Sequence, residues 1–178
     1  MCQTGPPASP PAIFITMKDV HNSSTPEGYH TLTAALVVKD GRAALDFYER
    51  ALGATVRRRM DGSDDSVMHA ELEIGDSCFM VSDEMPEWGN HSPQSLGGTP
   101  VSFCVYVADV DAAFARATGA GGKELMPVAD QFWGDRVGMF LDPFGHKWSL
   151  ATRIEEVSDE ETNRRGQDWV QENPVEKA

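Results

Sequence analysis

The sequence predicts an α+β fold made of two βαβββ modules, and three observations lead to this prediction. Five residues recur later in the chain, in the same order and at a constant spacing. The first copy is Val38, Asp40, Ala43, Ala44 and Gly53, and the second is Val107, Asp109, Ala112, Ala113 and Gly122. Three strand-like segments follow each copy. Hydrophobic residues make up 40% of the 178 residues, which is enough to build a core.

The first module covers residues 31–82. A β-branched run leads to Asp40, and residues 41–53 then place their apolar side chains on one helical face. Asp40 is positioned to cap this helix and Gly53 to stop it. A hairpin turn is expected at Gly75-Asp76. The three strands expected after the helix are Thr55–Met60, Ser66–Ile74 and Ser77–Ser82.

The second module covers residues 100–152 and repeats this order. A strand ends at Asp109, which is again placed to cap, and residues 110–122 form an amphipathic helix with a glycine stop. The segment Asp142–Gly145 is typical of a turn. The three strands expected after this helix are Lys123–Met126, Asp135–Leu141 and Lys147–Thr152. The two modules are expected to form a single domain over residues 31–152.

Two polar segments flank this domain. Residues 1–30 contain a proline-rich stretch and are expected to form a disordered or loosely draped arm, in which Met17 is an alternative start. Residues 153–178 form an acidic tail. Ser158 and Glu161 have the spacing of a capping box, which predicts a short helix within the tail.

Composition and charge exclude several classes of protein. The 15 Lys and Arg residues against 28 Asp and Glu give a net charge of −13, so nucleic acids and anionic membrane surfaces are not expected partners. No apolar run approaches the ~20 residues of a membrane span. Three cysteines without a C-x-x-C pair favour a reducing, cytoplasmic location. No base or cation lies near Cys78 or Cys104 in the sequence, so both are expected to pack.

Five segments resemble the vicinal oxygen chelate superfamily, which includes glyoxalases, bleomycin-resistance proteins and dioxygenases, and look most like its PhnB-like branch. They are Asp46–Tyr48, Leu52-Gly53, Met68–Leu72, Asp130–Arg136 and Asp142–Ser149. The resemblance implies eight strands in a curled mixed sheet with an open cleft. It also implies a homodimer whose clefts are formed or completed across the two-fold axis. It implies no single activity, because this scaffold serves lyases, dioxygenases and drug-sequestering proteins.

The metal-dependent members of this superfamily place one ligand on each of four strands, as His or Gln, Glu, His and Glu. The resemblance puts these positions at Thr33, Met80, Ser102 and Ser149. None of the four has a carboxylate or an imidazole, and methionine prefers soft metals. Because the neighbouring residues are apolar, a one-residue shift does not restore the ligands. The expectation is therefore a cleft without a metal or another cofactor.

His69 and Glu71 leave two interpretations open. They lie at alternate positions of one expected strand and point to the same side as Glu73. They either line the cleft or form the wet face of a half-buried sheet. A relocated divalent metal, bound by His69, Glu71 and either His146 or a partner subunit, is the alternative to a metal-free cleft. His146 directly follows a turn, where a structural role is expected.

The segment Asp130–Arg136 combines two aromatic rings, an amide and charged groups. The rings of Phe132 and Trp133 can stack on a ligand, while Gln131 and Arg136 orient it. The alternative is that the two rings cover an edge of the core. The segment therefore predicts a pocket wall, with core cover as the other interpretation.

Taken together, the residues favour a small-molecule-binding protein that lacks the usual divalent metal site. The net charge favours a cationic ligand and the exposed rings an aromatic one. A metal-dependent glyoxalase-like lyase or dioxygenase is the alternative, and a protein that acts only through its subunit interface is a third possibility. The expected ligand-binding residues are Thr33, His69, Glu71, Met80, Ser102, Gln131, Trp133, Arg136 and Ser149.

Overall fold

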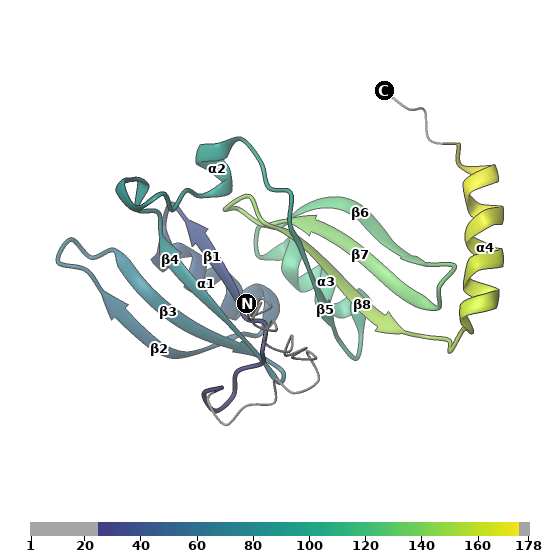
Figure 1. Cartoon of the computed structure of the whole chain (residues 1–178), viewed down its shortest axis with the longest axis horizontal. Helices are drawn as coiled ribbons and strands as arrows, with labels where there is room; N and C mark the ends of the chain where they lie inside the picture. The colour runs from purple at the N-terminus through teal and green to yellow at the C-terminus, as the bar shows by residue number, and fades with distance from the viewer. Residues whose placement is uncertain (1–24, 175–178) are drawn as a thin grey trace, which may run out of the picture.

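A computed structural model of the chain describes residues 25–174, and Figure 1 shows it as a cartoon. The two halves of the chain lie side by side along the longest axis of the molecule, each with its own sheet (Figure 1). The predictions for residues 1–24 of the expected arm and for residues 175–178 of the tail lie outside the described residues.

The N-terminal module consists of one helix and a four-stranded sheet. In this sheet the strand order is β1-β4-β3-β2. β1 runs parallel to β4, and the other neighbouring pairs are antiparallel. The elements are β1 (Ala34–Val38), α1 (Gly41–Leu52), β2 (Thr55–Asp61), β3 (Val67–Ile74) and β4 (Ser77–Asp83).

The C-terminal module repeats this arrangement with the strand order β5-β8-β7-β6. The predicted α+β fold with two βαβββ modules is therefore confirmed. The eight strands form two four-stranded sheets and not one continuous sheet, because β1 and β5 are edge strands that no ladder connects. The elements are β5 (Ser102–Tyr106), α3 (Val110–Gly119), β6 (Lys123–Asp130), β7 (Asp135–Leu141) and β8 (Lys147–Arg153).

Both helices begin as the repeat predicts. The carboxylate of Asp40 accepts the backbone N–H of Ala43 at 3.0 Å, and that of Asp109 accepts the N–H of Ala112 at 3.0 Å. Such caps satisfy N–H groups that have no partner within the helix. The repeated aspartate therefore caps the first helix of each module.

The two helices end differently. Gly53 takes the left-handed conformation, with φ 68°, and stops α1 as predicted. α3 already ends at Gly119, so Gly122 is not its stop. A Cβ on Gly122 would lie 2.8 Å from the ring of Phe140, so close packing against β7 requires glycine there. The same residue in the repeat has a conformational role in one module and a packing role in the other.

A buried carboxylate joins the two modules. The hydroxyl of Tyr48 in α1 and the indole N–H of Trp148 in β8 both donate to Oδ2 of Asp142, at 2.8 and 2.9 Å. The other oxygen of Asp142 accepts the backbone N–H groups of Phe144 and His146. Burial and the neighbouring carboxylate raise the pKa of the Tyr48 phenol well above its ordinary value. The phenol therefore remains a donor, and every oxygen of this buried charge is bonded.

The connector between the modules contains η2 (Pro86–Trp88) and α2 (Pro93–Leu96). Glu84 accepts the backbone N–H and hydroxyl of Ser92 and the hydroxyl of Ser95. The pKa of Glu84 is lowered from 4.5 to about 2. The hydrogen bond from the Ser92 backbone has the largest effect, and those from the two hydroxyls come next. Because the folded-state pKa is the lower one, these bonds stabilise the fold above pH 4.5, and the stabilisation is lost as the pH falls towards about 2.

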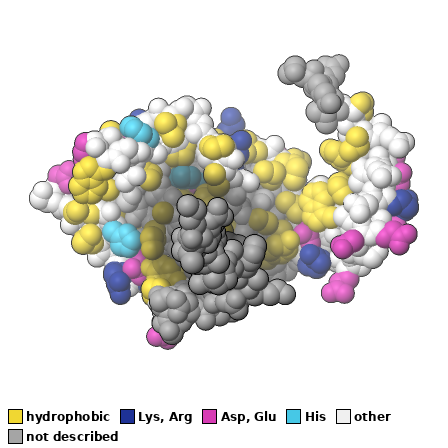
Figure 2. Space-filling model, in the orientation of Figure 1, with side chains coloured by type: hydrophobic (Ala, Val, Ile, Leu, Met, Phe, Trp, Pro, Cys, Tyr) yellow, Lys and Arg dark blue, Asp and Glu magenta, His cyan; other side chains and the backbone are white. Residues whose placement is uncertain are grey.

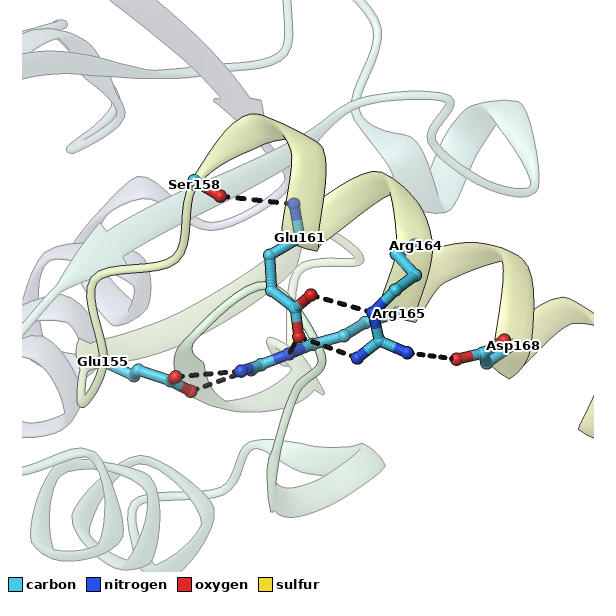
Figure 3. A network of polar contacts seen from close by, with 6 residues as sticks. All are labelled: Glu155, Ser158, Glu161, Arg164, Arg165 and Asp168. Atoms are coloured by element: carbon cyan, nitrogen blue, oxygen red, sulfur yellow. Dashed lines mark hydrogen bonds and ion pairs between the residues drawn. The ribbon is translucent and has the colours of Figure 1, made fainter.

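The predicted C-terminal helix is present as α4 (Asp159–Glu172) and is longer than expected. The Ser158 hydroxyl accepts the backbone N–H of Glu161 at 3.3 Å, as the capping-box spacing predicts. The Glu161 carboxylate does not return this contact, because it pairs with Arg164 and Arg165 (Figure 3). Arg165 also pairs with Glu155 before the helix, at 2.8 Å. These charged contacts fix the start of the helix to the chain that precedes it.

Few contacts attach the rest of α4 to the molecule. The ring of Trp169 lies 6.1 Å from that of Phe132, at the tip of the β6–β7 hairpin. In Figure 2, hydrophobic side chains gather where α4 faces the C-terminal sheet, and charged side chains lie on its outer side. None of the described helices, α4 included, is long and apolar enough to cross a membrane.

We predict that Tyr48→Phe destabilises the protein by about 1.5–3 kcal/mol, because it removes a buried hydrogen bond to a charged group. Urea unfolding followed by circular dichroism measures the change in the free energy of unfolding. Arg42→Gln removes the exposed ion pair with Asp65 and is the control, with an expected change within about 0.5 kcal/mol. A Tyr48→Phe protein as stable as the control variant would contradict the proposed importance of Asp142.

Candidate functional site

A cavity with a volume of about 760 Å³ lies on the N-terminal sheet. Its floor is the face of the sheet that points away from α1, and its wall is the chain segment before β1. The lining residues are Thr25, Pro26, Glu27, Tyr29, His30, Thr31, Thr33, Arg57, Arg58, Glu71 and Met80.

Strand alternation explains which side chains reach this cavity. Ala70 and Leu72 of β3 are fully buried against the core, so Glu71 between them points the other way. On β4, Phe79 and Val81 are likewise buried, and Met80 between them lines the cavity.

A break in this alternation brings two consecutive arginines to the cavity. The pairing of β2 with β3 shifts register between Val56 and Arg58. Such an irregularity re-aims side chains at a sheet edge. Arg57 and Arg58 consequently both line the cavity, although neighbouring strand residues ordinarily face opposite sides.

Glu71 is the buried centre of the polar cluster in this cavity. Arg58 Nη1 lies 3.2 Å and His69 Nε2 lies 3.5 Å from its Oε1. Burial alone would raise the pKa of Glu71, but the hydrogen bond from Tyr29, the charge of Arg58 and the contact with His69 outweigh it and lower that pKa. Conversely, burial and the bond to Glu71 raise the pKa of the Tyr29 phenol. Glu71 is therefore an ionised group, with Arg58 and His69 both directed at its Oε1.

Arg57 is held on three sides. Its Nη1 donates to Sγ of Cys78 at 2.8 Å, its Nε lies 3.3 Å from Glu73, and its Nη2 contacts the backbone carbonyl of Glu27 at 3.5 Å. Gly28 has φ 80°, and a Cβ there would clash with this guanidinium. Arg57 therefore fastens the cavity wall to the sheet. It also supplies the cation beside Cys78 that the neighbouring sequence does not show.

The four positions of the superfamily's metal ligands do not fit a hard divalent ion. Thr33 and Met80 line the cavity, while Ser102 and Ser149 lie on the C-terminal sheet. The hydroxyl of Thr33 donates to a backbone carbonyl, and that of Ser149 does the same. Hydroxyls and a thioether are poor ligands for such ions. Across residues 25–174, no group of three or more His, Cys, Asp or Glu side chains is arranged to hold a metal ion.

His146 does not join His69 and Glu71. It is buried in the turn before β8, and its Nε2 lies 3.1 Å from the backbone carbonyl of Val37. It borders a smaller cavity of about 340 Å³ between β1 and the connector. The structural role expected for His146 fits this position.

Trp133 belongs to a second polar cluster, on the outer face of the C-terminal sheet. Asp135 has an exposed fraction of only 3% and accepts bonds from Tyr106, Trp133 and Arg153 at 2.8, 3.2 and 2.6 Å. Burial opposes ionisation of Asp135, but the bonds from Tyr106 and Arg153 outweigh it and lower its pKa. The side chains of Tyr106, Trp133 and Arg153 remain substantially exposed. Asp135 therefore holds two aromatic rings in place at the protein surface.

The side chains of Gln131 and Arg136 take no part in either cluster. β6 continues beyond Met126 to Asp130, so Gln131 lies in a tight hairpin turn, where its amide bonds to Ala129. Arg136 contacts Asp111 of α3 at 2.8 Å and Asp130 at 2.7 Å. Its guanidinium therefore ties β7 to the helix side of the sheet. The structure brings Thr33, Glu71 and Met80 together, with His69 alongside.

The sequence interpretation missed Tyr29, Arg57 and Arg58. Tyr29 falls in the expected arm, and the Arg57–Arg59 run looks like a set of surface ion pairs. Two consecutive arginines on the strand next to that of Glu71 could have indicated a polar cluster, because β2 and β3 are consecutive strands joined by a hairpin. The sequence does not indicate the shift in register that directs both arginines towards the cavity.

Comparison with known proteins identifies the family of this chain. The sequence model of the Glyoxalase/Bleomycin resistance protein/Dioxygenase superfamily matches residues 30–150. An uncharacterized protein of Mycobacterium tuberculosis is 44% identical over 133 residues, which are 73% of this chain and 78% of that protein. An uncharacterized protein of Arabidopsis thaliana is 29% identical over 124 residues, or 66% of this chain and 74% of that protein.

Solved structures show the same architecture. TioX from Micromonospora sp. ML1 has a TM-score of 0.56 at 28% identity, covering 69% of this chain and 98% of TioX. The Arabidopsis thaliana gene product also has a TM-score of 0.56 at 28% identity, covering 68% and 98%. A glyoxalase/bleomycin resistance protein/dioxygenase from Nocardioides, with 22% identity, a TM-score of 0.54 and coverage of 80% and 93%, supports the fold alone.

We predict that Tyr29→Phe raises the pKa of Glu71, because the change removes a hydrogen bond to the charged carboxylate. A carbon-13 NMR titration of the glutamate side-chain carboxyls measures this pKa. The folded-state pKa of Glu71 is lowered, so its bonds stabilise the fold above the ordinary glutamate pKa of about 4.3, and this stabilisation is lost as the pH falls.

The matched control is Tyr106→Phe, which removes the corresponding bond to Asp135 in the other module. It is expected to leave the titration of Glu71 unchanged. An unchanged Glu71 pKa in Tyr29→Phe would show that the phenol does not support this carboxylate.

Proposed function

The chain belongs to the Glyoxalase/Bleomycin resistance protein/Dioxygenase superfamily, and from this premise we propose that it is a small-molecule-binding protein of the PhnB-like branch. The observation that carries the proposal is the cavity on the N-terminal sheet. It combines the apolar Met80 and the ring of Tyr29 with the oriented polar groups of Glu71 and Arg58. Its volume of about 760 Å³ is within the usual range for ligand sites.

The proposal favours binding over proton-transfer chemistry. Glu71 has a lowered pKa, and Arg58 and His69 both contact its Oε1. A general base works best with a pKa near the operating pH and with a free lone pair directed at its substrate. A carboxylate with these contacts is better suited to holding other side chains in place.

We also propose a homodimer, which would bring the two outer sheet faces together around the ligand. The cavity is lined from the N-terminal module and the segment before it. Ser102, Trp133 and Ser149 lie on the other module, so they would reach the ligand of a second copy. A cytoplasmic location is part of the proposal and is supported by the unpaired thiols of Cys78 and Cys104.

We expect untagged protein purified without chelator to contain far less than one metal ion per chain, because hydroxyls and a thioether occupy the ligand positions. Elemental analysis by mass spectrometry, before and after soaking in nickel, zinc or manganese, measures the metal content. Close to one tightly held ion per chain or per dimer would instead support the metal-dependent alternative. His69 and Glu71 would then be the first residues to replace.

We predict that Met80→Trp abolishes ligand binding, because the larger side chain fills the floor of the cavity. Thermal unfolding in the presence of a library of aromatic and charged compounds gives the readout. A compound at 100 times its Kd stabilises the folded protein by about 2.7 kcal/mol and raises the Tm accordingly. The control is Met68→Trp on β3, which lies outside the cavity lining and should keep the response.

Two results would count against this function. One is the same set of stabilising compounds in Met80→Trp and in the unmodified protein. The other is a broad library in which no compound raises the Tm of the unmodified protein.

A further inference from the structure

We propose that the ligand of this cavity carries an anionic oxygen group, a carboxylate or a phosphonate, which binds the guanidinium of Arg58. The proposal rests on the proposed binding function and specifies its ligand class. It departs from the cationic ligand that the net charge of −13 favours. The charges that a ligand meets are those of the cavity lining, because exposed charges elsewhere are screened beyond about 10 Å.

The lining contains two carboxylates, and neither offers a strong cation site. Glu71 is buried, and its Oε1 is contacted by Arg58 at 3.2 Å and by His69 at 3.5 Å. Glu27 is exposed on the wall, and among residues 25–174 no side chain holds its carboxylate in place, whereas Glu71 holds the similarly exposed Arg58. A cation beside Glu71 would also lie next to the guanidinium of Arg58, which is 3.2 Å from Oε1 and whose positive charge opposes its binding.

The two arginines of the lining differ in what they have left to offer. All three nitrogens of Arg57 have partners, in Cys78, Glu73 and the Glu27 carbonyl. Arg58 makes one described contact, from Nη1 to Glu71, and its side chain is 73% exposed. A guanidinium carries five N–H donors in a planar fork. Arg58 therefore presents unused donors to the cavity while Glu71 holds it in place.

Guanidinium groups match the geometry of anionic oxygens, because two parallel N–H groups can bind two oxygens at once. The rest of the lining suits the body of such a molecule, since Met80, Pro26 and the ring of Tyr29 provide apolar contacts. The ligand class is therefore a small amphiphilic acid, with an apolar or aromatic body and one anionic group.

Four probes with the same phenyl body test the assignment on the full chain: phenylacetate, phenylphosphonate, neutral phenylacetamide and cationic phenethylamine. NMR titration of nitrogen-15-labelled protein measures each Kd and follows the arginine Nε–H signals. We expect the two anions to bind and to shift the Arg58 signal, with the amide and the amine at least about tenfold weaker. A preference for only one anion would separate the carboxylate from the phosphonate.

The Arg58→Gln variant should weaken the binding of the anions by about ten- to a hundredfold and leave the amide unchanged. Arg59→Gln is the matched control, because it removes the same charge from the next residue, which pairs with Asp61 at 2.6 Å and is absent from the lining. Equal losses of affinity in the two variants would show that the effect comes from the net charge of the protein, and would overturn the assignment.

Three other outcomes would also overturn it: tightest binding by phenethylamine with a loss in Glu27→Gln, equal binding of the anions and the amide, or no binding by any probe. The Met80→Trp variant separates this failure from that of the proposed function. If Met80→Trp abolishes binding of the amide while Arg58→Gln has no effect on the anions, the cavity binds small molecules without selecting anions. If Met80→Trp changes nothing, the cavity itself is not the binding site.

Discussion

The structure depends on the buried carboxylate of Asp142. Each of its oxygens is occupied, one by the side chains of Tyr48 and Trp148 and the other by backbone N–H groups of its own turn. A charge in this position is stable only with all of these partners, and each partner is oriented by it in return. Since Tyr48 lies on α1 and Trp148 on β8, the bond fixes one module against the other. The outer faces of the two sheets are consequently held in a defined relation.

The two modules share a scaffold and differ in what their outer faces carry. Each face has one buried carboxylate, Glu71 or Asp135, which accepts from a tyrosine and contacts an arginine. The two carboxylates are not at equivalent strand positions, and the N-terminal cluster has a wall beside it, formed by the chain before β1. In both clusters the carboxylate pKa is lowered, because the donors outweigh burial. Glu71 and Asp135 therefore hold aromatic and arginine side chains in place at the surface.

Local patterns predicted the strands and the three longer helices, but not η2, α2 or the full length of β6. Strand alternation placed Glu71 away from the core, the repeat located both helix caps, and the Ser158 spacing located α4, because each depends on neighbours in sequence. The composition of the cavity depends on contacts between distant residues. The register shift in β2, the fold of Tyr29 onto the sheet and the pairing of Arg136 with Asp111 are such contacts. The spacing of hydrophobic residues and the amino-acid composition carry no information about such contacts.

The wall formed by the chain before β1 has a consequence for how the binding range of this protein can change. This wall is held by Arg57, and it contributes no strand to the sheet. Insertions and substitutions in residues 25–31 therefore alter the shape of the cavity without disturbing the aromatic core or the Asp142 bond. Surface segments of this kind tolerate change better than packed elements. Divergence in ligand preference among relatives is thus expected to concentrate in this short stretch, while the floor of the cavity remains constant.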